Sequence, residues 1–113
     1  MTEQKHKLYE GMYILRGELH EEASLKALDK IKAGITQHGG EIVKVHTQGR
    51  RKLCYQIMKQ REGHYFLVYF KLDPAMIAEL WQEYRMNENL LRFMTMRTEK
   101  VLDELKFKQL PEQ

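Results

Sequence analysis

Hydrophobic and polar residues in the first third of the chain follow two different periodicities. Strand-forming residues fill positions 8–15, and Gly17 ends that segment. From Glu21 onward, apolar side chains recur three or four positions apart, which predicts a helix. Gly39 and Gly40 end this helix because glycine adopts the left-handed conformation at little cost. His20 stands where a Ser or Asp cap would be expected.

Alternating β-branched residues predict a second strand from position 41, continuing past Gly49 to position 55 with the glycine at a bulge or bend. Residues 61–63 have the composition of a turn. Residues 64–70 are apolar on both faces of the strand, which is typical of a central strand.

Asp73 and Pro74 mark the start of a second helix, as an N-cap followed by proline at the first helical position. Apolar residues between positions 77 and 84 form one face of that helix. Residues 87–89 end it, and residues 91–97 form a last strand.

The predicted order is β-α-β-β-α-β, which is the split βαβ or ferredoxin-like α+β pattern. Right-handed crossovers place both helices on one face of a four-stranded antiparallel sheet. Residues 1–98 are predicted to form this single domain. Residues 99–113 form a C-terminal extension with roughly helical spacing of apolar residues, either a docked helix or a segment that orders on a partner.

Composition is that of a soluble globular protein, because 42% of the 113 residues are hydrophobic and no run is long enough to span a membrane. The N-terminus lacks the apolar stretch of a signal peptide, so we expect a cytoplasmic protein. The single cysteine, Cys54, cannot form an internal disulfide, and we interpret it as a reduced thiol.

No motif indicates a cofactor, a metal site, a small-molecule substrate or a catalytic residue. The five histidines and Cys54 lack the spacing of metal ligands, and no phosphate-binding glycine motif is present. A Cys54 nucleophile paired with a histidine stays open as an alternative, because such residues meet only in the folded chain.

The net charge of +3 is modest, but the cations are segregated. No acidic residue occurs from position 42 to position 61, a stretch that contains the run Arg50, Arg51 and Lys52. Consecutive cations beside a glycine suit backbone phosphates, and each arginine can bind two phosphate oxygens. A solvated charged hairpin is the alternative. Further cations on strands or their ends favour RNA binding, and the RNA-binding residues predicted from this pattern are Lys44, Arg50, Arg51, Lys52, Arg61, Arg92 and Arg97.

The aromatic strand resembles the base-stacking strands of RNA-recognition domains only weakly, because Glu62 interrupts that signature. We interpret it instead as core on one face and a protein-contact surface on the other. The predicted partner-binding residues are Tyr65, Leu67, Tyr69 and Phe93.

Five blocks of the chain together resemble bacterial small-subunit ribosomal protein six. They are residues 9–16, 39–45, 49–53, 59–65 and 87–95, and they occur in order across residues 8–98. The chain departs from the family pattern at Gln56, where the strand lacks its usual proline.

The resemblance implies a structural role in the small ribosomal subunit. Members of this family bind the central domain of the small-subunit ribosomal RNA together with ribosomal protein eighteen, with which they form a heterodimer. By the same resemblance Arg50, Arg51 and Lys52 occupy the family's basic block, and Arg85 and Arg92 reach RNA or the partner protein. The alternative function is a protein-interaction module of the same fold that binds no RNA.

Overall fold

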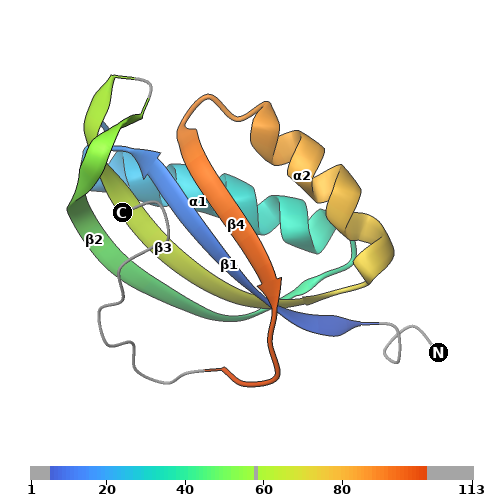
Figure 1. Ribbon diagram of the computed structural model, residues 1–113. Coiled ribbons are helices and arrows are strands. Elements are labelled where there is room, and N and C mark those ends of the chain that lie inside the picture. The colour runs from blue at the N-terminus through green and yellow to red at the C-terminus, as the bar shows by residue number, and fades with distance from the viewer. Residues whose placement is uncertain (1–5, 58, 102–113) are drawn as a thin grey trace.

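A computed structural model describes residues 6–57 and 59–101, without the side chains of residues 54–56. Its elements are β1 (Lys7–Arg16), α1 (Glu21–Gln37), β2 (Glu41–Ile57), β3 (Gln60–Leu72), the short 3-10 helix η2 (Pro74–Met76), α2 (Ile77–Arg85) and β4 (Leu90–Arg97). The strands form one antiparallel sheet in the order β2-β3-β1-β4. Figure 1 shows both helices on the same face of this sheet. The predicted ferredoxin-like fold is confirmed.

The core lies between the sheet and the two helices, and β3 runs through its centre. Phe66, Val68 and Phe70 point toward the helices and are at most 3% exposed. The alternate residues of β3 point to the opposite face, because successive side chains of a strand alternate. The run of residues 64–70, apolar on both faces, therefore correctly predicted a strand with a neighbour on each side.

Local chemistry accounts for the helix boundaries at two of the three predicted positions. The Asp73 carboxylate accepts a hydrogen bond from the Ala75 backbone N–H at 3.0 Å, as an N-cap does. His20 makes no side-chain cap to α1. Gly39 follows α1 with a φ of 87°, the left-handed conformation that made glycine the expected residue there.

The predicted turn at residues 61–63 is wrong, because these residues belong to β3. The chain reverses earlier, next to Lys59, whose φ of 69° lies in the left-handed region. Gly63 is required for packing: a Cβ atom on it would lie 2.5 Å from Cγ2 of Ile14. The glycine thus marks a close approach of β3 to β1 and not a chain reversal.

The predicted C-terminal extension falls almost entirely outside the described residues. Residues 99–101 are described and lie outside any helix or strand. The domain boundary at residue 98 therefore stays a prediction.

Candidate nucleic-acid interface

The predicted basic run lies in the hairpin formed by β2 and β3. In the strand register Arg50 pairs with His64, Arg51 with Gly63, and Lys52 with Glu62. Side chains alternate along a strand, so Arg51 points to the opposite face from its two basic neighbours. Three consecutive cations therefore do not form one patch on a single face.

Two side chains of the hairpin bind the same backbone carbonyl, that of Leu19 in the segment before α1. The Leu19 carbonyl oxygen accepts a hydrogen bond from Nη2 of Arg50 at 2.9 Å and another from Nε2 of His64 at 2.6 Å. His64 is buried, whereas the Arg50 side chain stays 46% exposed. Arg50 can therefore hold its place in the hairpin and still present part of its guanidinium to a ligand.

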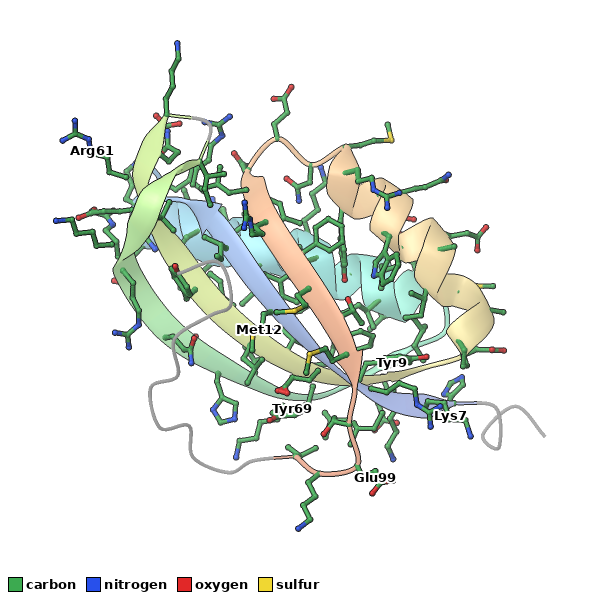
Figure 2. The ribbon with its side chains drawn as sticks, in the orientation of Figure 1. Lys7, Tyr9, Met12, Arg61, Tyr69 and Glu99 are labelled. Atoms are coloured by element: carbon green, nitrogen blue, oxygen red, sulfur yellow. The ribbon has the colours of Figure 1, made fainter. Side chains whose placement is uncertain are left out.

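An acidic residue offsets part of the positive charge of the hairpin. An oxygen of Glu62 lies 3.9 Å from Nε of Arg50, and Glu62 also stands opposite Lys52 in the strand register. Both partners of the ion pair are about half exposed, so the pair adds little stability but lowers the local positive potential. Arg61 is exposed, and its side chain extends away from the hairpin into solvent (Figure 2).

The other predicted RNA-binding residues lie outside the hairpin. Lys44 stands opposite Tyr69 near the start of β2, and it is half-buried. Arg85 is exposed in the last turn of α2. Arg92 and Arg97 lie in β4 on opposite faces of the sheet, because an odd number of positions separates them. The structure thus separates the predicted set into a hairpin group and a group around α2 and β4.

The predicted partner-binding residues do not share a face. Tyr65, Leu67 and Tyr69 point away from the helices and are 1%, 4% and 1% exposed. Figure 2 shows Tyr69 and Met12 in front of the sheet, on the face opposite the helices. Phe93 stands opposite Tyr13 and lies on the helix side, where its ring meets Tyr84 edge-on at a centroid distance of 5.0 Å.

Sequence reasoning missed a hollow between α2 and β4. It has a volume of about 280 Å³ and is lined by Trp81, Arg85, Phe93, Met94 and Thr95. The sequence pattern places Trp81 only on the apolar face of the second helix. Its spacing of four residues from Arg85 was the available signal, because residues four apart on a helix are neighbours.

Two buried tyrosines lie between the hollow and the core, and one of them contacts Phe93 in the wall of the hollow. The hydroxyl groups of Tyr13 and Tyr84 are 2.7 Å apart, and the ring of Tyr84 also packs against Phe93. Burial raises the pKa of both hydroxyls well above the usual value, because the charged phenolate is unfavourable away from water. Both groups therefore remain neutral throughout the physiological pH range.

Other kinds of site find no support in residues 6–57 and 59–101. This part of the chain contains no group of three potential metal ligands and no helix that could cross a membrane. The alternative of a Cys54 nucleophile, which the sequence leaves open, involves a side chain that lies outside the described residues.

The fold and the charged hairpin define the class of protein: a ferredoxin-like domain with a basic surface. A likeness of 12% sequence identity and TM-score 0.59 to the C-terminal domain of the MgtC protein from Mycobacterium tuberculosis supports the fold alone.

A family model described as ribosomal protein S6 matches residues 8–97. Among curated proteins, small ribosomal subunit protein bS6 of Protochlamydia amoebophila is 52% identical over 113 residues, covering 100% of this chain and 99% of the relative. The protein of the same name from Chlamydia caviae is 54% identical over 112 residues, covering 99% of this chain and 100% of its own.

The crystal structure of 30S ribosomal protein S6 from Thermotoga maritima is similar, with 34% identity and a TM-score of 0.77. The match covers 83% of this chain and 89% of that one. The chain belongs to the ribosomal protein S6 family and is a protein of the small ribosomal subunit. Its relatives are structural proteins of the ribosome, and it is not an enzyme.

Proposed function

We propose that this protein binds the central domain of the small-subunit ribosomal RNA in the cytoplasmic ribosome, together with ribosomal protein eighteen. Membership of the S6 family supports the ribosomal role, and the hairpin supports the binding of RNA. Binding would occur mainly through phosphates and RNA shape. The few cations on one hairpin can neutralise only a few phosphates, so cooperative binding with a partner protein is expected.

The observation that carries the proposal is the anchored hairpin. Arg50 is held by the Leu19 carbonyl and keeps about half of its side chain in solvent. A cation that is positioned before RNA arrives loses less side-chain freedom on binding. We assign phosphate contacts to Arg50, Arg51, Lys52 and Arg61, with Lys44 extending the surface along β2.

The partner protein is proposed to contact the sheet on the face away from the helices. Tyr65, Leu67 and Tyr69 lie on that face and present only small parts of their side chains. The neighbouring residues Met94 and Met96 of β4 add more accessible apolar surface, and Met96 is 48% exposed.

The test is a titration of labelled central-domain RNA with the full chain and with the double variant Arg50→Ala/Arg51→Ala, each with and without ribosomal protein eighteen. We expect affinity to fall by about tenfold or more, and the slope of log affinity against log salt to fall by about 2, because two phosphate contacts are lost.

A matched control is Lys26→Ala/Lys30→Ala, which removes the same charge from exposed positions of α1. Equal affinity of the hairpin variant and the wild type at low salt would contradict the assignment of this site. If neither protein binds the RNA while association with the partner persists in high salt, the chain is a protein-interaction module of the same fold.

A further inference from the structure

The hollow between α2 and β4 is a preformed aromatic surface. The indole N–H of Trp81 donates a hydrogen bond to Oγ1 of Thr95 at 3.1 Å, which fixes the ring across the gap between helix and strand. Phe93 is held edge-on against Tyr84, whose hydroxyl is bonded to that of Tyr13. Contacts within the domain itself therefore hold both aromatic rings in place.

The outer edge of β4 adds hydrogen-bonding groups beside these rings. β4 is an edge strand whose described neighbour is β1. The Thr98 backbone N–H donates to the Leu8 carbonyl, so residues at even positions of β4 point their backbone groups toward β1. The N–H and C=O groups of Phe93, Thr95 and Arg97 therefore point outward, where they can pair with donors and acceptors of a ligand.

The charge around the hollow is positive. Arg85 lines it directly, and Arg97 lies on the same side of β4, four residues beyond Phe93. Among the residues that the structure describes, none that lines the hollow is acidic. An anionic ligand with a flat ring fits this combination of cations, aromatic rings and outward-facing backbone groups.

We propose that this hollow binds one unpaired nucleotide of the RNA, with its base against Trp81 and Phe93 and its flanking phosphates near Arg85 and Arg97. The inference rests on the proposed function and extends it, because it adds a base-binding site to an interface otherwise made of phosphate contacts. Stacking on an aromatic side chain tolerates any base, whereas hydrogen bonds to the β4 edge favour particular ones.

An extended acidic peptide that adds a strand to β4 is the competing ligand, since it would also use the outward N–H and C=O groups. The size of the hollow favours the nucleotide. Its volume of about 280 Å³ is confined to five lining residues, whereas an added strand would need contacts along the whole edge of β4.

Trp81 is the only tryptophan of the chain, so its fluorescence reports on this hollow alone. The probes are a short RNA duplex with one unpaired adenosine and the same duplex fully paired, titrated into the full-length protein. We expect the unpaired adenosine to quench the fluorescence of Trp81 and the paired duplex to leave it unchanged. Anisotropy of dye-labelled RNA measures binding of both duplexes independently of the tryptophan.

Two substitutions test the role of the ring. Trp81→Leu removes the stacking surface, and we expect about tenfold weaker binding of the duplex with the unpaired adenosine and no change for the paired duplex. Trp81→Phe keeps an aromatic ring without the bond to Thr95, and most of the preference for the unpaired base should remain. Because Trp81→Leu also removes packing, its thermal unfolding is compared with that of Trp81→Phe.

Each outcome has a separate meaning. Equal binding of the two duplexes without quenching, combined with weaker binding by Arg50→Ala/Arg51→Ala, would overturn the base-binding site and leave the proposed function standing. Loss of binding to both RNAs, with and without the partner protein, would overturn the proposed function and the inference with it. Quenching by a peptide of alternating valine and glutamate, but not by the unpaired adenosine, would assign the hollow to a protein strand.

Discussion

The β2–β3 hairpin and the α2–β4 hollow both present arginines to solvent, yet they are organised in different ways. The hairpin carries consecutive cations, of which Arg50 shares the Leu19 carbonyl with His64 and lies near the acid Glu62. The hollow combines Arg85 with aromatic residues that are attached to the core through Tyr84. The comparison shows that the number of cations alone does not predict how strongly a surface attracts an anionic ligand. Neighbouring carbonyls and carboxylates determine how much of the positive charge remains available to that ligand.

The two regions are also supported differently, which predicts that each can be disturbed without the other. The hairpin depends on a close backbone contact between Gly17 and Glu62, at which a Cβ atom on the glycine would overlap the Glu62 carbonyl group. The hollow depends on the buried tyrosine pair. Three predictions, in order of decreasing size, test this separation.

The largest effect is expected for Gly17→Ala. The added methyl group meets backbone atoms of Glu62, which cannot move aside as a side chain can, so we expect a loss of about 2–3 kcal/mol in the free energy of unfolding. RNA binding through the hairpin should weaken, while quenching of Trp81 by the unpaired adenosine should persist. Denaturant unfolding and the fluorescence titration measure the two effects.

Gly39→Ala is the control for this substitution. Gly39 has a φ of 87°, but a methyl group added to it would meet no atom within 4 Å, so only backbone strain of about 1 kcal/mol is expected. A smaller loss for Gly17→Ala than for Gly39→Ala would contradict the close contact.

The second prediction concerns alkaline pH and the support of the hollow. The pKa values of Tyr13 and Tyr84 are raised in the folded state above the ordinary value of 10.0, because both hydroxyls are buried. The contribution of the two hydroxyls to the free energy of unfolding is fully present below pH 10. It is lost as the pH rises, because the unfolded chain then releases protons that the folded chain retains. Each tyrosine lowers the free energy of unfolding by up to about 1.4 kcal/mol per pH unit above about pH 10.

Tyr13→Phe separates this effect from general alkaline unfolding. The variant should be less stable at neutral pH by about 1–2 kcal/mol, because Tyr84 loses its hydrogen-bond partner, but its stability should decline less steeply above about pH 10. Equal slopes for the variant and the wild type in unfolding experiments between about pH 9 and pH 11 would show that the pair does not control this decline.

The smallest effect is expected for Glu62→Gln. Removing this carboxylate raises the positive potential of the hairpin, so RNA affinity should increase by about two- to threefold at low salt and by less at high salt. Glu41→Gln changes the net charge equally at an exposed position at the far end of β2. If both variants bind RNA equally well, Glu62 has no specific influence on the hairpin.

Much of the fold was predictable because local patterns and tertiary packing agree. Residues 64–70, apolar on both faces, form the middle of the central strand β3, and Asp73 with Pro74 marks the start of the second helical segment. The hairpin turn was mispredicted because glycine occurs both in turns and where two strands pack closely. At position 63 it allows β3 to approach Ile14, and Lys59 adopts the positive φ near the turn instead.

The candidate sites were only partly predictable. The run Arg50, Arg51 and Lys52 is evident in the sequence, but its distribution over the two faces of the sheet follows only from the strand and its register. The sequence groups Phe93 with Tyr65 as partner surface, although the register with Tyr13 places it on the helix side. No linear pattern connects Trp81 with Thr95, because their hydrogen bond exists only where α2 crosses β4.

The sequence by itself determined the order of elements, the ferredoxin-like fold and the family, because these follow from periodicity and from ordered blocks along the chain. Only the tertiary structure decided which charges are offset, which aromatic rings remain accessible and which residues meet in the hollow. These properties depend on distances between segments far apart in the chain, such as that between Arg50 and the Leu19 carbonyl. They arise when the sheet and helices pack together, and no local interaction specifies them.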